Sequence, residues 1–324
     1  MKACIVGAGA IGGFIGARLA HSGVEVCALS RGPTLEALQR DGWRLHVAGE
    51  LLEAPVRASG DPAQLGVQDL IVVAVKAHAM PEVALTIAPL MHANTIVMPA
   101  MNGVPWWFLK GEPQFGAAPL ESVDPGGIVS RAIPLSRVLG CVVHASAARV
   151  EPGVVRVHQG RRLIVGEPSG GASERAERVA SLLQGAGFEV ERSSDVRRDI
   201  WYKLWGNMTM NPVSAITGAT ADLILADREL SAFCAAAMRE AAAIGARIGC
   251  PIEETPEDRQ RVTAKLGAFK TSMLQDAEAG RPIELDAIVA VVAEIGRRVA
   301  VPTPNVDAIL GLARLFGRVH GIYP

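Results

Sequence analysis

The feature that most constrains this chain is a glycine-rich turn near its start. Residues 3–6 form a short apolar run, typical of a buried strand, and lead directly into the glycine-rich stretch 7–13. A helix over 14–21 and a second strand over 24–29 are expected next. Glycines at these spacings allow a sharp turn, close approach of the backbone to a pyrophosphate, and tight packing of the helix on the sheet. We therefore predict a dinucleotide-binding turn made of Gly7, Ala8, Gly9, Ala10, Ile11 and Gly12.

The context of this turn separates it from a chance match. A chain with 34 glycines contains some G-x-G-x-x-G spacings by accident, and a turn that binds nothing is the alternative interpretation. Here a strand precedes the turn and a helix follows it. The start of that helix offers unpaired N–H groups and the positive end of a dipole to phosphate oxygens.

The end of the second strand indicates which dinucleotide is preferred. An NAD site usually has Asp or Glu there to bind the ribose hydroxyls. This chain has Leu-Ser-Arg-Gly at 29–32 and no carboxylate. The planar guanidinium of Arg31 suits a 2′-phosphate, although a solvated surface arginine is the alternative. NADPH is therefore the predicted cofactor.

Composition narrows the class of protein. With 324 residues, 49% of them hydrophobic and 20% charged, the chain should fold into two globular domains. A net charge of −1 gives no basic surface for nucleic acid or an anionic membrane. We see no signal peptide and no apolar run long enough to span a membrane, so a cytoplasmic location is expected.

Cysteine and histidine usage argues against disulfides and metal ions. The five cysteines are scattered and include no C-x-x-C pair, and the seven histidines form no cluster with ligand spacing. We expect the cysteines to be small buried residues in a reducing compartment, and we expect no metal site.

Secondary-structure patterns divide the chain in two. Strands and helices alternate through the first part, with a continuous apolar strand at 69–75, another strand at 95–98, and a segment at 43–59 that is hard to classify. From residue 195 onward the pattern is almost wholly helical, including helices over 195–210, 256–277 and 285–299. We predict an α/β Rossmann-type NADP-binding domain over 1–193 and an all-helical substrate and catalytic domain over 194–324. The apolar helical domain is compatible with a homodimer.

Polar residues follow the ends of two later strands of the sheet. Ligands of open parallel sheets gather at the carboxyl ends of the strands. Lys76 stands there after one strand and could face a cofactor phosphate or a substrate carboxylate, or be a plain surface charge. Asn102, followed by Gly103, could be a turn or could bind the ribose or carboxamide end of the cofactor.

A second group of polar residues lies in the helical part. Lys203, Asn207 and Asn211 recur every four positions and would share one stripe of a helix flanked by Trp and Met. An amine and two amides are an unusual lining for a buried helix, since such groups need partners. The stripe predicts a substrate site, and a polar patch that closes against the first domain is the alternative.

Two further segments carry candidate residues. Ser272 and Asp276 stand one helical turn apart, and Glu284 and Asp286 occur where a loop leads into a helix. Acidic residues are common at helix starts for dipole reasons alone. Glu284 is therefore open to either interpretation, helix-start carboxylate or site residue.

Together these motifs resemble the ketopantoate reductase family (2-dehydropantoate 2-reductase) over nearly the whole chain. The markers that carry the resemblance are Gly7-x-Gly9-x-x-Gly12, Val75-Lys76-Ala77, Asn102-Gly103, Trp201-x-Lys203-Leu204-x-x-Asn207-x-x-x-Asn211-Pro212, Ser272-Met273-Leu274-Gln275-Asp276 and Glu284-x-Asp286. The lysine helix and the Ser-Met-x-x-Asp segment are the most specific of them.

The resemblance implies NADPH-dependent reduction of ketopantoate to pantoate. By the same analogy Lys203 would be the catalytic lysine, Glu284 its partner carboxylate, and Asn207, Asn211 and Ser272 the substrate contacts, with Lys76 and Asn102 at the junction of cofactor and substrate. The substrate would bind between the two domains. A lysine ammonium could both stabilise the developing alkoxide and protonate it.

Two departures from the family pattern leave the substrate open. The chain has Trp106-Trp107-Phe108 where many members have small residues, and Phe269 where some have a polar contact. These aromatics could narrow the pocket or simply pack. A reductase of another, bulkier 2-keto acid is one alternative, and a non-catalytic NADPH-binding sensor is another.

Overall fold

The computed structural model describes residues 1–324, apart from the side chain of Pro113. Its contacts group into two compact units. The sheet unit comprises Met1–Pro113 and Asp124–Asp199, and the helical unit comprises Gln114–Val123 and Ile200–Pro324. The domain division expected at residues 193–194 stays a prediction. In the part of the chain that the structure describes, no helix is long and apolar enough to cross a bilayer.

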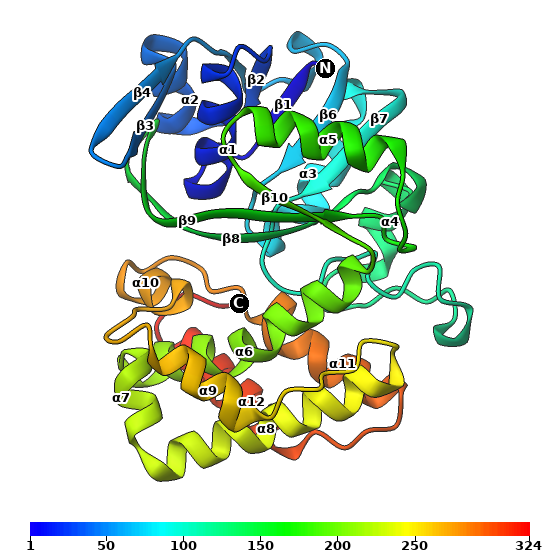
Figure 1. The fold of residues 1–324 in the computed structure, drawn as a ribbon, viewed down its shortest axis with the longest axis vertical. Coiled ribbons are helices and arrows are strands. Elements are labelled where there is room, and N and C mark those ends of the chain that lie inside the picture. Colours follow the sequence, from blue (N-terminus) through cyan, green and yellow to red (C-terminus); the bar gives the residue numbers. More distant parts are fainter. The chain divides into compact units, whose positions relative to one another are not determined.

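A five-stranded parallel sheet organises the sheet unit (Figure 1). Its strands, in the spatial order β5-β2-β1-β6-β7, are β5 (Arg57–Ser59), β2 (Val26–Leu29), β1 (Ala3–Val6), β6 (Gln68–Val73) and β7 (Met91–Pro99). Val6 is in register with Leu29 of β2 and with Val73 of β6. The carboxyl ends of the three central strands therefore lie at one edge, and the predicted α/β dinucleotide-binding class is confirmed.

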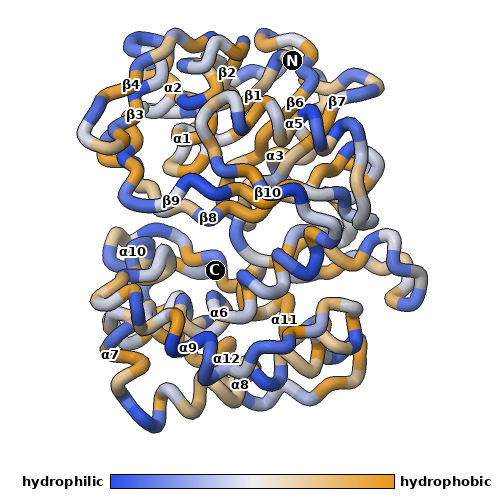
Figure 2. Tube along the Cα trace, viewed as in Figure 1, coloured by the Kyte–Doolittle hydropathy of each residue, from blue (hydrophilic) through white to orange (hydrophobic). Residues whose placement is uncertain are grey.

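Helices connect these strands, as crossovers between parallel strands require. The connections are α1 (Ala10–His21) after β1, α2 (Gly32–Asp41) after β2 and α3 (Met80–Thr86) after β6. The strands carry hydrophobic colour over much of their length (Figure 2). In β1 all residues are buried, as expected of a strand covered on both faces.

A second sheet packs on the other side of α1. It runs β10-β9-β3-β4 with β8 paired to β9, and its strands are β3 (Trp43–Val47), β4 (Glu50–Ala54), β8 (Gly140–Glu151), β9 (Val154–Gly166) and β10 (Glu189–Ser193). Phe14 of α1 belongs to one hydrophobic cluster with Ile5 of β1 and Val155 of β9, and it meets Phe188 edge-on at 4.9 Å between ring centroids. Burial of α1 between these layers holds the glycine turn that precedes it.

The second sheet explains the segment that the sequence left unclassified. Residues 43–54 form the hairpin of β3 and β4, and 57–59 form the edge strand β5 of the first sheet. In the same sheet, residues 154–166 form one continuous strand, β9, although exposed residues at 159–161 interrupt its apolar pattern.

The helical unit is built around α6. Its elements are α6 (Val196–Thr217), α7 (Ala221–Ala226), α8 (Arg228–Arg247), α9 (Pro256–Ala264), α10 (Ser272–Glu278), a π-helical turn (Asp286–Ala290), α11 (Val291–Arg298) and α12 (Pro304–Val319). The helical character predicted for this part of the chain is confirmed. α6 extends past its expected end at Met210 and runs through Pro212.

The prediction of a single helix over 256–277 is wrong. The chain breaks at Gly267, whose φ of +64° is left-handed. The carbonyl of Phe269 accepts a hydrogen bond from the Ala221 N–H at 3.0 Å, and Thr271 caps a new helix by accepting from the Leu274 N–H at 3.2 Å. A tertiary contact and a helix cap therefore replace the continuous helix.

Two indole groups anchor α6 to α8. Trp201 Nε1 donates to the carbonyl of Ala241 at 3.2 Å, and Trp205 Nε1 donates to the carbonyl of Met238 at 2.7 Å. Both rings are fully buried. Because the donors are four residues apart, they pin one face of α6 and determine which residues its other faces present.

A short segment of the helical unit comes from the middle of the chain. The carboxylate of Glu294 on α11 accepts hydrogen bonds from the N–H groups of Glu121 at 2.8 Å and Ser122 at 2.9 Å. Arg298 donates to the carbonyl of Ala118 at 3.0 Å. Burial raises the pKa of Glu294, but the hydrogen bonds from this segment outweigh burial, and the pKa lies below its usual range.

This lowered pKa predicts an acid-sensitive anchor. A carboxylate whose pKa is lowered by folding stabilises the protein above its unfolded pKa, and that stability is lost as the pH falls through the folded pKa. Glu294→Gln should lower the free energy of unfolding by about 1–3 kcal/mol at pH 7, and this difference should shrink below about pH 4.5. Urea unfolding at several pH values measures it. Glu229→Gln, at an exposed site, is the control, and a pH-independent difference for Glu294→Gln would contradict the account.

Candidate functional site

The glycine turn has the geometry of a phosphate cradle. Gly7 has φ +89°, and a Cβ on Gly12 would lie 2.0 Å from the Gly7 carbonyl oxygen, so neither position accepts a side chain. Gly9 precedes α1 without a side-chain cap, and a Cβ there would meet nothing within 4 Å. The space beside Gly9 is therefore open, and an uncapped helix start at this position suits a pyrophosphate.

The parallel sheet brings three predicted cofactor residues to the same edge. Arg31 follows β2, Lys76 follows β6 and Asn102 follows β7, and these strands run parallel to β1. Lys76 and Asn102 are half-buried, whereas Arg31 is exposed. Their convergence on the glycine turn is a consequence of strand order and direction.

Arg31 has a partner that sequence reasoning missed. Its Nη1 lies 2.6 Å from Oε1 of Glu82, and its Nη2 lies 3.1 Å from Oε2. Glu82 stands in the first turn of α3, where an acidic residue is ordinary for dipole reasons, so its position gave no signal. Only the tertiary structure brings the two side chains together.

The aromatic residues after Asn102 belong to the core of the sheet unit. Trp107 is 1% exposed and Phe108 is fully buried. Arg197 stacks over the Phe108 ring at 5.3 Å, donates to the Phe108 carbonyl at 2.9 Å and pairs with Glu112 at 2.6 Å. Of the two roles that the sequence left open for these residues, packing is the one that these contacts support.

The predicted polar stripe lies on a single helix. Lys203, Asn207 and Asn211 all belong to α6, so their four-residue spacing places them along one side of it. Lys203 and Asn207 are half-buried, and Asn211 is 5% exposed. The indoles of Trp201 and Trp205 occupy a different, roughly opposite face of α6, and their bonds to α8 hold the stripe in a defined orientation.

One contact attaches the segment of the predicted substrate residue Ser272 to this helix. The hydroxyl of Ser214 on α6 bonds to that of Thr271, the cap residue of α10, and both are buried. Ser272 is the first residue of α10 and is exposed, and the Ser214–Thr271 bond attaches its segment to α6 three residues beyond Asn211.

Glu284 sits on a loop that is held at several points. Arg281 pairs with the buried carboxylate of Asp276 at 3.0 Å, and the Ile283 N–H donates to the carbonyl of Ile322 at 3.0 Å. Tyr323 donates to Asp286 at 2.6 Å. Burial, together with this hydrogen bond, raises the pKa of Tyr323 to about 12, so the hydroxyl keeps its proton at neutral pH.

The residues that support the predicted site, Thr271, Ser214 and Tyr323, could hardly be predicted from the sequence. Thr271 before a helix is a normal capping signal, but the expected helix over 256–277 concealed it. The roles of Ser214 and Tyr323 depend on contacts between segments far apart in the chain. In the part of the chain that is described, no group of three or more His, Cys, Asp or Glu side chains is arranged to bind a metal ion.

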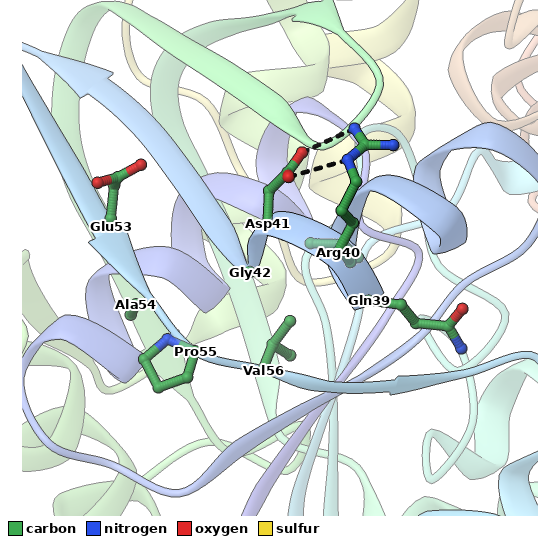
Figure 3. A pocket seen from close by; sticks show the side chains of 9 residues that line it. Gln39, Arg40, Asp41, Gly42, Glu53, Ala54, Pro55 and Val56 are labelled. Carbon is green, nitrogen blue, oxygen red and sulfur yellow. Dashed lines mark hydrogen bonds and ion pairs between the residues drawn. The ribbon is translucent and has the colours of Figure 1, made fainter.

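A separate concavity lies elsewhere in the sheet unit (Figure 3). It has a volume of about 470 Å³ and is formed by the end of α2, the end of β4 and the two residues that follow β4. Arg40 and Asp41 pair at its rim at 2.8 Å. None of the predicted site residues lines it, so it is not the candidate site.

Known proteins share both halves of this chain. A family model described as ketopantoate reductase PanE/ApbA matches residues 3–170, and its C-terminal counterpart matches residues 195–316. A 2-dehydropantoate 2-reductase of Mesorhizobium japonicum is 43% identical over 326 aligned residues, which cover 100% of both chains. The chain belongs to the ketopantoate reductase family.

Solved structures agree with this membership of the ketopantoate reductase family. A protein from Ralstonia solanacearum MolK2, provisionally named a ketopantoate reductase, is 56% identical, covers 99% of each chain and superposes with a TM-score of 0.96. A 2-dehydropantoate 2-reductase from Geobacter metallireducens GS-15 is 26% identical, with a TM-score of 0.85 over 97% of this chain and 99% of that one. The resemblance inferred from the sequence motifs is therefore confirmed at the level of family and fold.

The capping contact at Thr271 generates a stability prediction for this family member. Thr271→Ala removes a helix cap and the bond to Ser214, and should lower the free energy of unfolding by about 1–2 kcal/mol. Thr271→Ser keeps the hydroxyl and should therefore retain most of the wild-type stability. Urea unfolding followed by circular dichroism measures both variants. Thr255→Ala, at the exposed cap of α9, is the control. A cost for Thr271→Ala no larger than that of the control would contradict the bridging role.

Proposed function

We propose that this protein is an NADPH-dependent 2-dehydropantoate 2-reductase that reduces ketopantoate to pantoate. The observation that carries the proposal is the braced Lys203–Asn207–Asn211 stripe in a chain that is 43% identical to a 2-dehydropantoate 2-reductase over its full length. A 2-keto acid has a carboxylate and a ketone oxygen, and an amine with two amides offers donors to both.

Residues of the sheet unit would hold the cofactor. The N–H groups at Gly9–Gly12 suit the pyrophosphate, and Arg31 suits a 2′-phosphate. Lys76 and Asn102 would contact the cofactor near its reactive end. NADPH, when bound, supplies the hydride.

Residues of the helical unit would act on the substrate. The Lys203 ammonium would stabilise negative charge that develops on the ketone oxygen and would protonate that oxygen. Glu284 would orient the ammonium. Asn207, Asn211 and Ser272 would hold the rest of the 2-keto acid, because orientation by fixed donors lowers the entropic cost of reaction.

The substrate itself is tested by a panel of 2-keto acids. NADPH absorbance should fall fastest, by kcat/KM, with ketopantoate. A clear preference for phenylpyruvate would show that the protein reduces a bulkier 2-keto acid instead of ketopantoate. The packing of Trp107 and Phe108 in the core weakens this alternative, because these side chains then do not shape the substrate pocket. Tight NADPH binding without turnover of any 2-keto acid would favour the alternative that the protein is a non-catalytic NADPH-binding sensor. A cytoplasmic location and a homodimer remain predictions.

Lys203 provides the first mutational prediction. Lys203→Ala should lower kcat by a factor on the order of 10² or more, because a charge stabiliser and proton donor is lost, while the Kd for NADPH should barely change. Steady-state kinetics and NADPH fluorescence titration measure the two quantities. Lys265→Ala, at an exposed position, is the control. An equal loss of NADPH binding would show that Lys203 has a structural role.

Arg31 provides the second mutational prediction. Arg31→Ala should weaken NADPH binding by roughly 1–3 kcal/mol, the range for hydrogen bonds to a charged group, and leave NADH binding almost unchanged. Fluorescence titration with each dinucleotide measures the effect, with Arg192→Ala on the second sheet as control. If both dinucleotides weakened alike, the 2′-phosphate assignment would be wrong.

A further inference from the structure

The Arg31–Glu82 ion pair occupies the guanidinium that the proposed function reserves for phosphate. Both guanidinium Nη atoms face carboxylate oxygens, at 2.6 and 3.1 Å. The side chains are 71% and 60% exposed, so the pair stands in solvent. The hydrogen bonds from Arg31 lower the pKa of Glu82, and those with Glu82 raise the pKa of Arg31, so both groups are charged at neutral pH.

The Arg31–Glu82 ion pair joins two connections that follow neighbouring parts of the parallel sheet. Arg31 precedes α2 directly after β2, and Glu82 lies in the first turn of α3 after β6. β1 runs between β2 and β6 and carries the glycine turn at its carboxyl end. The pair therefore links the two flanking connections at the edge where the ribose of a dinucleotide binds in folds of this type.

The chemistry of the two dinucleotides differs at this point. A 2′-phosphate would compete with Glu82 for the guanidinium of Arg31, and its charge would be repelled by the nearby carboxylate. A ribose 2′-hydroxyl is uncharged and can donate to a carboxylate. Glu82, on α3, would therefore offer a ribose the acidic group that is missing at the end of β2.

We propose that Glu82 is a specificity-determining residue: it competes with the 2′-phosphate for Arg31 and reduces the preference for NADPH over NADH. This inference rests on the proposed dinucleotide-binding function. An exposed ion pair is weak, so the 2′-phosphate displaces the carboxylate rather than being excluded by it. The effect on affinity is accordingly a modest factor.

The test is a titration of the full-length protein with NADPH and with NADH. In Glu82→Gln, the Kd for NADPH should fall about threefold to tenfold, while the Kd for NADH should stay within about twofold or rise. The gain for NADPH should shrink as salt is added, because the groups are exposed. Glu177→Gln is the matched control, since Glu177 on α5 (Glu174–Gly185) forms a similar two-pronged pair with Arg192 on β10. This substitution should leave both Kd values unchanged.

A double-mutant cycle ties the effect to Arg31. In an Arg31→Ala background, Glu82→Gln should no longer tighten NADPH through release of the guanidinium, and most of its effect should vanish. An unchanged or raised Kd for NADPH in Glu82→Gln would overturn the inference, although NADPH binding by the wild-type protein would leave the proposed function standing. If the wild-type protein bound neither dinucleotide, the proposed function itself would fail.

Discussion

The orientation of α6 is the constraint on which the candidate substrate site depends. A helix that presents an amine and two amides along one side must be prevented from turning about its axis. The buried indoles of Trp201 and Trp205 do this by donating to two carbonyls of α8. At the other end of the helix, the Ser214–Thr271 bond attaches the segment that carries Ser272. Buried hydrogen bonds of this kind specify geometry as well as add stability.

In the sheet unit, the predicted phosphate-binding geometry depends on the backbone rather than on side chains. The strand order places the glycine turn between the connections that carry Arg31 and Lys76. No side chain at Gly7 or Gly12 would fit, so the tight turn before α1 requires glycine at both positions. In our proposal, the choice between the two dinucleotides depends on the exposed Arg31–Glu82 ion pair at the same edge of the sheet. An exposed ion pair contributes little stability, so a charged ligand could displace it.

Local patterns were sufficient for the features that depend on local physics. The glycine turn, the apolar strands and the four-residue spacing on α6 could all be predicted because each depends on a few neighbouring residues. Features that depend on distant partners could not. The break before Thr271 depends partly on the Phe269–Ala221 contact, and β9 is interrupted in pattern by its own exposed residues. Glu82 looks like a routine helix-start acid until the fold sets it against Arg31. The role of Trp107 and Phe108 stayed open at the level of sequence because their packing against Gly140 and Arg197 involves residues far away in the chain.

The central claim is that the amine of Lys203 acts on the ketone of a bound 2-keto acid. A crystal structure of the protein with NADP⁺ and pantoate, or with a non-reducible analogue of ketopantoate, tests it most directly. The account predicts that Lys203 Nζ lies about 2.6–3.2 Å from the oxygen on the reacting carbon, with Asn207 and Asn211 also in contact with the ligand. An ammonium directed into solvent, with that oxygen held by other groups, would contradict it.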